Sequence, residues 1–65
     1  MIGLTKLNNQ GFVVNADLIK FVETTPDTLV TLTTGEKILV RETQEEVIRR
    51  VVQYGRMLRR LLEPS

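Results

Sequence analysis

The segment from residue 25 to residue 35 most narrowly limits what this chain can fold into. It reads Thr-Pro-Asp-Thr-Leu-Val-Thr-Leu-Thr-Thr-Gly. Pro26 presets φ for a turn, and Asp27 can bond to its own backbone. The Thr-Leu-Val-Thr-Leu-Thr stretch that follows is rich in β-branched residues, which favour a pleated strand. Gly35 then permits the positive φ of a tight turn. The segment therefore predicts a turn, a strand and a second turn.

Five short strands are expected in the first two thirds of the chain. Their approximate bounds are residues 2–7, 12–14, 18–24, 28–33 and 37–41. Turns of about three to four residues separate them, and such turns join antiparallel neighbours rather than parallel ones. Gly11 is the expected positive-φ residue of the first turn. Simple alternation along the third strand predicts Ile19 and Phe21 on one face and Val22 on the other.

Several of these strands carry apolar side chains on both faces. A single helix can cover only one face of so small a sheet. Two interpretations are open for the second face. Its apolar side chains are exposed, as a minority of apolar residues are in any protein, or they are buried in a homo-oligomer.

One helix is expected after the sheet, from about residue 44 to about residue 62. Thr43 and Glu46 form a Thr-x-x-Glu capping box ahead of an apolar run. The apolar stripe has helical period and consists of Val47, Ile48, Val51, Val52, Gly55, Leu58, Leu61 and Leu62. At a rise of about 1.5 Å per residue the helix is roughly 28 Å long. This is long for so small a domain, so we expect its last turns to project past the sheet toward a partner.

The predicted fold class is α+β. About five short antiparallel strands form a small meander sheet or a partly open barrel, and one C-terminal amphipathic helix follows. The 65 residues make one domain, with the sheet at about 2–41 and the helix at about 44–62. A chain of this length buries only ~60% of the surface of its unfolded state. It has no cysteine for disulfides, so further stability must come from close packing or from self-association.

The composition argues against an enzyme. The chain has no histidine and no cysteine, and these side chains supply many of the bases, nucleophiles and metal ligands that work near neutral pH. Gly11 and Gly35 are isolated turn glycines and make no phosphate-binding loop. We therefore expect no catalytic residue, no cofactor and no metal.

The N-terminal segment and the hydropathy pattern bear on location. The opening Met-Ile-Gly-Leu-Thr-Lys lacks the basic start and the continuous apolar stretch of a signal peptide. No run of the chain approaches the ~20 apolar residues that a membrane span needs. We expect a cytoplasmic protein that does not span a membrane.

Positive charge is concentrated in the predicted helix. Residues 1–42 carry four Lys/Arg and five Asp/Glu, net −1, whereas residues 43–65 carry five Arg and three Glu, net +2. The overall charge of +1 argues against a strong general nucleic-acid binder. A polar stripe opposite the apolar one consists of Arg49, Gln53, Arg56 and Arg60, and Arg59 lies beside it; together these five residues are the candidate interaction surface. It is either a solvated face, on which Glu46 pairs with Arg49 or Arg50, or a surface for an acidic partner, lipid headgroups or a nucleic-acid backbone.

Gly55 lies in the middle of the predicted helix, where glycine costs about 1 kcal/mol relative to alanine. One interpretation is that it lets the helix lie close to the sheet, or to Phe12 or Phe21. The other is a close helix–helix crossing in an oligomer. The candidate oligomer contacts are Gly55, Leu58 and Leu62.

A series of short motifs runs through nearly the whole chain, from about residue 2 to about residue 55. In order they are Leu7-Asn8, Asn15-Ala16-Asp17-Leu18-Ile19, Thr25-Pro26-Asp27-Thr28, Val30-Thr31-Leu32, Gly35, Lys37, Val40, Glu42 and Glu46-Val47. This order resembles the FlbD/SwrD-type family of small flagellar and swarming motility proteins. The Thr-Pro-Asp-Thr-x-x-Thr-Leu-x-x-Gly block is the most specific part.

The resemblance implies a non-enzymatic cytoplasmic accessory protein that supports flagellar motor function or swarming motility. Protein–protein interaction with a flagellar or motor component, at the flagellar base, would then be its mode of action, with a homo-oligomer as the expected form. The size and element order are also similar to those of the carbon-storage regulator family of RNA-binding dimers. A small RNA- or DNA-binding regulator is therefore the alternative, although the basic residues here lie on the helix and no matching loop motif is present.

Overall fold

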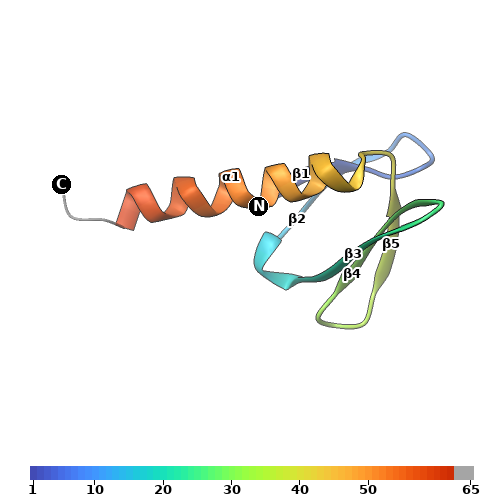
Figure 1. Ribbon diagram of the computed structural model, residues 1–65, viewed down its shortest axis with the longest axis horizontal. Helices are drawn as coiled ribbons and strands as arrows, with labels where there is room; N and C mark the ends of the chain where they lie inside the picture. Colours follow the sequence, from blue (N-terminus) through green and yellow to red (C-terminus); the bar gives the residue numbers. More distant parts are fainter. Residues whose placement is uncertain (63–65) are drawn as a thin grey trace.

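The computed structural model describes residues 1–62 as five strands, one short 3-10 helix and one long α-helix (Figure 1). The elements in chain order are β1 (Ile2–Thr5), β2 (Gly11–Val14), η1 (Ala16–Leu18), β3 (Ile19–Thr25), β4 (Asp27–Leu32), β5 (Lys37–Val40) and α1 (Gln44–Leu62). All strand pairs are antiparallel. The predicted α+β class, with five short strands followed by one helix, is confirmed.

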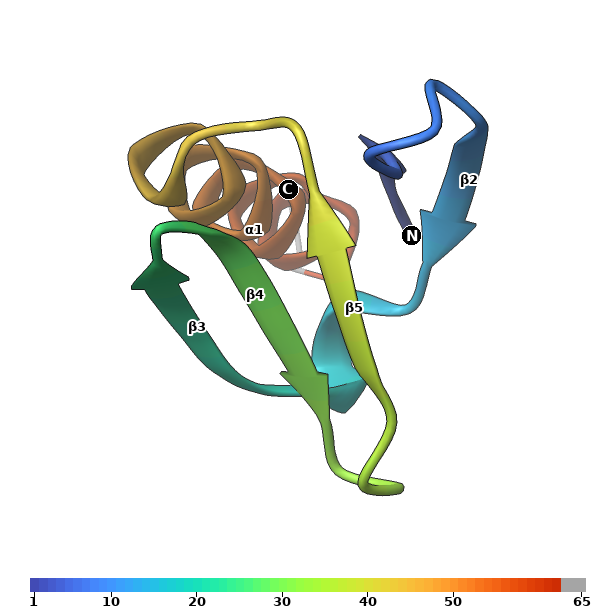
Figure 2. The ribbon, with the colours of Figure 1, turned by 90° about the vertical axis from the view of Figure 1, so that its right-hand side faces the viewer.

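The strands form two small sheets that meet at one point. One is the β1–β2 hairpin, and the other is a meander in the order β3–β4–β5. A single bridge pairs Lys6 with Val40, and the Arg41 N–H donates to the Thr5 carbonyl at 2.8 Å. Figure 2 shows the hairpin standing beside β5 while α1 crosses one face of the meander. The five strands thus form an open, curved wall around the first half of the helix.

The core lies between α1 and the inner faces of both sheets. Val30 and Val40 are almost fully buried there, and Val47 of α1 is fully buried against them. Ile2 and Leu4 contribute from β1. These positions are the ones that alternation in the strands and the helical period of the apolar stripe assign to the inside.

The third strand departs from simple alternation. A β-bulge between Ile19 and Phe21 shifts the register, so that Ile19 pairs with Leu32 while Val22 pairs with Val30. Ile19 and Val22 therefore both pack on the core, and Phe21 is exposed on the outer face. The prediction that Ile19 and Phe21 share a face is wrong, because a bulge places two residues opposite one and reverses the alternation beyond it.

The turns are partly as predicted. Gly35 has a φ of 95°, as the second turn of the 25–35 segment required. In the first turn the positive φ, 71°, belongs to Asn9, and Gly11 is the first residue of β2. The expectation for Gly11 is thus wrong, since asparagine also tolerates the left-handed region. The Asn8 side chain stabilises this turn by accepting a hydrogen bond from the Gln10 N–H at 3.0 Å.

The Thr-x-x-Glu motif predicts two reciprocal hydrogen bonds at the start of α1, and one of them is formed. The Glu46 N–H donates to Thr43 Oγ1 at 3.1 Å. The Glu46 carboxylate does not return to the cap; it forms ion pairs with Arg49 at 2.8 Å and with Arg50 at 3.0 Å. Both neighbours predicted for Glu46 are therefore bound at once.

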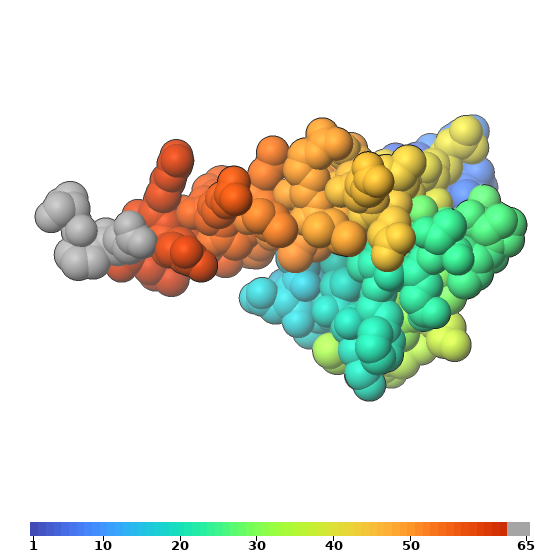
Figure 3. All heavy atoms as spheres, in the orientation of Figure 1, coloured from blue at the N-terminus to red at the C-terminus, as the bar shows by residue number. Residues whose placement is uncertain are grey.

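The helix extends well past the sheet, so the molecule is elongated. Its principal extents are 43 × 22 × 18 Å and its radius of gyration is 12.6 Å, against about 10.7 Å for a compact domain of this length. Figure 3 shows α1 as a rod leaving a rounded body. The expected projection of the last helical turns is confirmed.

Candidate interaction surface

The helix changes surroundings halfway along its length. Val47 has 0% of its surface exposed, and Val51 and Tyr54 pack on the same core. Leu61 is 75% exposed and Leu62 is 82% exposed. We call residues 55–62 the projecting end of α1, because the sheet does not extend under them (Figure 1).

The predicted arginine stripe is placed on the outer side of α1. All five of its residues are exposed: Arg49, Gln53, Arg56, Arg59 and Arg60. They do not share one environment. Arg49 lies over the sheet and is paired with Glu46, whereas Arg56, Arg59 and Arg60 belong to the projecting end and form no ion pair with any residue from 1 to 62.

An apolar hollow lies between the arginines of the projecting end. Its walls are Gln53, Arg56, Met57, Arg60 and Leu61, and its volume is about 330 Å³. An arginine side chain combines an aliphatic stem with a charged head, so a hollow lined by arginines is apolar inside and positively charged at its rim. The surface can therefore offer both an apolar contact and positive charge to the same partner.

Gly55 has open space around it. A Cβ atom built on Gly55 meets nothing within 4 Å. The interpretation that this glycine lets the helix lie against the sheet, Phe12 or Phe21 is therefore wrong. The helix leaves the sheet at this point, so the fold of residues 1–62 gives no reason for a glycine here.

Arg50 is not part of the candidate interaction surface; its side chain connects α1 to β1. Its Nη1 donates to the Gly3 carbonyl at 2.6 Å and lies 3.4 Å from the Glu42 carboxylate. Glu42 also accepts hydrogen bonds from the Thr5 N–H at 2.8 Å and the Thr5 hydroxyl at 2.9 Å. These contacts fasten the β1–β2 hairpin to the start of α1.

The environment of Glu42 favours its charged form. Burial by itself acts to raise the pKa of this carboxyl, but the hydrogen bonds from Thr5 and from the residue's own backbone, together with the Arg50 charge, outweigh it and lower the pKa below its usual value. Sequence reasoning missed this role of Glu42, because the bond to Thr5 spans 37 positions of the chain. No local pattern encodes such a contact.

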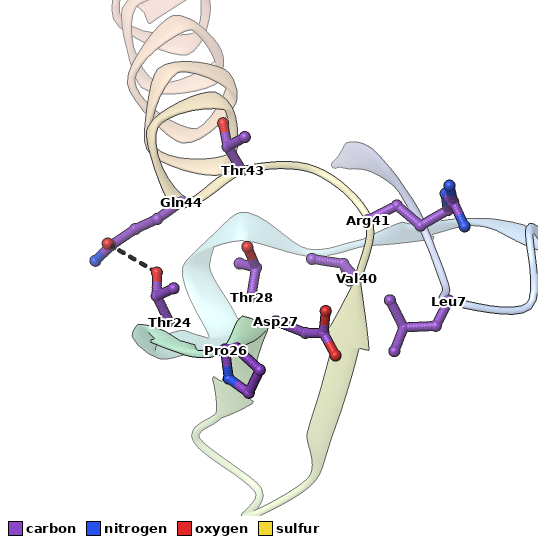
Figure 4. A pocket seen from close by; sticks show the side chains of 9 residues that line it. All are labelled: Leu7, Thr24, Pro26, Asp27, Thr28, Val40, Arg41, Thr43 and Gln44. Atoms are coloured by element: carbon purple, nitrogen blue, oxygen red, sulfur yellow. Dashed lines mark hydrogen bonds between the residues drawn. The ribbon is translucent and has the colours of Figure 1, made fainter.

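A polar hollow lies at the opposite end of the molecule, and sequence reasoning also missed it. Its volume is about 380 Å³. Figure 4 shows the residues that line it: Leu7, Thr24, Pro26, Asp27, Thr28, Val40, Arg41, Thr43 and Gln44. Gln44 accepts from the Thr24 hydroxyl at 3.2 Å and donates to the Val22 carbonyl at 3.0 Å. The Arg41 guanidinium is turned away from the Asp27 carboxylate. The Thr-Pro-Asp-Thr turn forms one wall, which is the only sequence signal for this feature.

Neither hollow has the residues of a metal or acyl-transfer site. Within the described part of the chain, no three or more Asp, Glu, His or Cys side chains gather at a possible metal site. Among residues 1–62, no helix has both the length and the apolar character required to cross a membrane. What the surface offers chemically is positive charge, hydroxyl and amide groups, and apolar contact.

Comparison with known proteins supplies the family. No curated protein and no solved structure matches the chain significantly. The family model described as "Flagellar and Swarming motility proteins" matches residues 1–58, which includes the Thr-Pro-Asp-Thr turn, all five strands and most of α1. The chain therefore belongs to the FlbD family of flagellar and swarming motility proteins.

Proposed function

We propose that this chain is a non-enzymatic accessory protein of flagellar motility or swarming, acting in the cytoplasm at the flagellar base. Its working surface is the arginine side of the projecting end of α1, and its partner is an acidic surface of a flagellar or motor component. The observation that carries the proposal is that Arg56 and Arg60 line an apolar hollow on a part of the helix that the chain's own core does not use, with Arg59 exposed on the same part of the helix.

The electrostatics support a binding role rather than catalysis. The carboxylate with a shifted pKa, Glu42, is held by Thr5 and Arg50 in contacts that join β1 to α1. A carboxylate held in its charged form by structural hydrogen bonds is poorly suited to act as an acid or base near neutral pH. The arginines of the projecting end, by contrast, have no acidic neighbour among residues 1–62 to satisfy them.

The strength of such a contact follows from its composition. Exposed ion pairs contribute only about 0–1 kcal/mol each, so charge alone would mainly raise the association rate and select the partner. An apolar partner side chain inserted between Met57 and Leu61 would add the larger part of the affinity. Binding should therefore weaken with salt but not vanish.

The test is complementation of a gene deletion. Wild type, the triple variant R56E/R59E/R60E and a control triple variant, K20E/K37E/R41E, are each expressed in the deletion strain. The control reverses the same number of exposed charges on the sheet. We expect wild type and control to restore swarm expansion and the helix variant to fail. Full complementation by the helix variant at equal protein level contradicts the proposal.

The same arginines motivate the second candidate function, an RNA- or DNA-binding regulator. Guanidinium groups without acidic neighbours can contact phosphates. Filter binding of mixed RNA and DNA at low and moderate salt tests this directly. Phosphate contacts are strongest at low salt, so absence of binding there removes this candidate and leaves the motility proposal intact.

A further inference from the structure

We propose that two copies of this chain dimerise through the projecting ends of α1, paired antiparallel about a two-fold axis beside Leu58. The dimer does not require the partner proposed above. It uses the side of α1 that continues the core-facing stripe, and it shares only Leu61 with the hollow between Arg56 and Arg60. Four observations lead to it: the continuity of the apolar face, the shape of the molecule, the position of Gly55 and the distribution of charge.

The face that α1 buries against the sheet continues beyond it. Val47, Val51 and Tyr54 face the core, and Leu58, Leu61 and Leu62 extend the same side of the helix at helical spacing. Leu61 and Leu62 are largely exposed. Leu58, which precedes them on this side, is half-buried within its own chain. A helix side that is buried at its start and becomes apolar but exposed toward its end indicates an interface between chains.

The shape of the molecule limits what can cover this side. Figures 1 and 3 show the body of the protein on one side of α1, so that the projecting end and the body enclose a corner. This is the side that carries the apolar face, because Val47, Val51 and Tyr54 pack on the core. A flat surface such as a bilayer cannot reach into this corner, because the body would strike it first. A rod can, and a second copy brings a rod with a matching apolar side.

A two-fold arrangement fills both corners at once. The projecting end of each copy lies in the corner of the other, against its apolar side. The body of each copy then lies next to the C-terminal end of its partner's helix. This is an isologous interface, in which the same patch serves both copies and the assembly closes at two. It covers the exposed side of Leu61 and Leu62 in both chains.

The antiparallel register gives Gly55 a role. With Leu58 opposite its own copy, Gly55 lies opposite Leu61 of the partner subunit, and Tyr54 lies opposite Leu62 of the partner subunit. The open space at Gly55 then receives a leucine side chain. Facing large and small residues in this way is how packed helices interdigitate.

The charges agree with this arrangement. Arg56 and Arg60 lie on the side of α1 opposite the apolar face, so the dimer buries neither and leaves the arginine surface accessible. Arg59 lies at the border of the face, near the tip. η1 occupies the edge of the body nearest the projecting end (Figure 1), and its Asp17 is exposed and forms no ion pair with residues 1–62. The partner's helix tip would bring an arginine toward it.

Cysteine cross-linking tests the register, because the natural chain has no cysteine. In the L58C variant the two thiols meet at the two-fold axis, so mild oxidation should convert most of the protein to a covalent dimer. R56C is the matched control, two residues away on the opposite side of the helix. Equal cross-linking of the two variants, or none in L58C, overturns the proposed pairing.

Light scattering after size exclusion tests the dimer itself. Wild type should have twice the chain mass at micromolar concentration. L62E should weaken dimerisation at least tenfold, whereas V13E, which changes an apolar residue 67% exposed on β2, should not.

G55L should weaken dimerisation to a similar extent, while circular dichroism shows that the variant stays folded. A wild type that stays monomeric, or L62E that dimerises normally, overturns the proposal. Monomeric wild type that cosediments with phosphatidylglycerol vesicles through Leu62 would assign the face to lipid instead.

Discussion

At the scale of single residues, Glu42 connects the β1–β2 hairpin to α1. Its carboxylate binds the Thr5 N–H, the Thr5 hydroxyl and the Arg50 guanidinium. These three groups come from β1 and from α1. Removing the charge should therefore loosen the β1–β2 hairpin from the helix more than it disturbs the β3–β4–β5 meander.

The lowered pKa of Glu42 predicts how stability depends on pH. Because the pKa in the folded protein lies below that in the unfolded chain, the unfolded chain binds more protons in acid. The stabilisation is therefore present above the ordinary glutamate pKa of about 4.3 and is lost as the pH falls through the folded value. We expect the free energy of unfolding, measured in urea between pH 7 and pH 3, to decline over this acidic range.

E42Q isolates the contribution of this one carboxylate. At pH 7 the variant should lose about 1.5–3 kcal/mol of unfolding free energy, the usual range for hydrogen bonds to a charged group. It should also lose part of the acid dependence of wild type. E36Q, at an exposed turn residue, is the control. Parallel pH curves for wild type and E42Q would contradict the assignment.

Gly55 supports a second prediction at this scale. Because a Cβ at this position meets nothing within 4 Å among residues 1–62, G55A should raise the stability of the monomer by up to about 1 kcal/mol through helix propensity alone. The comparison belongs in the L62E background, where self-association does not contribute. A destabilised G55A/L62E protein would mean that Gly55 is packed within its own chain after all.

At the scale of elements, the fold could be predicted closely where local signals are strong. The threonine-rich strand, its two turns and the helix start at Thr43 were all evident from residue type and period. The bulge after Ile19 and the positive φ at Asn9 were not, because they depend on how β3 and β4 meet and on which of several turn residues takes the strained position. Local sequence does not decide either.

The candidate interaction surface, too, could be predicted from the sequence only in part. The arginine stripe follows helical period, so its residues could be named from the sequence. Their difference in environment could not, since it depends on where the sheet ends under α1. The Glu42 contacts and the polar hollow beside Pro26 join segments distant in the chain, which no local pattern reports.

The two sides of α1 should respond differently to the same substitution. V47A removes two methyl groups from a fully buried position and should cost roughly 2–3 kcal/mol of unfolding free energy. V52A, at a position 44% exposed on the same helix, should stay within about 0.5 kcal/mol of wild type. Urea unfolding of both variants measures this. Equal losses would show that α1 is covered on both sides.

At the scale of the whole molecule, the elongated shape comes from one element only. The rounded body consists of the five strands and the first half of α1, whose apolar side chains complete the core at Val47, Val51 and Tyr54. The projecting end adds length without adding to that core. A chain under selection only for its own stability would have little use for these turns, and this is why the two proposals above both place their contacts there.

Removing the projecting end should therefore shorten the molecule without unfolding it. A variant that ends at Gly55 keeps every helix residue that packs on the core. By small-angle scattering its radius of gyration should be about 10 Å, the value for a compact domain of that length, compared with 12.6 Å for the molecule with its full helix. The reference is full-length L62E, which should be monomeric, so that the comparison is between two monomers. Circular dichroism and a cooperative urea transition check that the shortened chain is folded. A folded variant whose radius of gyration stays near that of the reference would mean that the helix end lies against the body in solution, and the corner that receives the second copy would not exist.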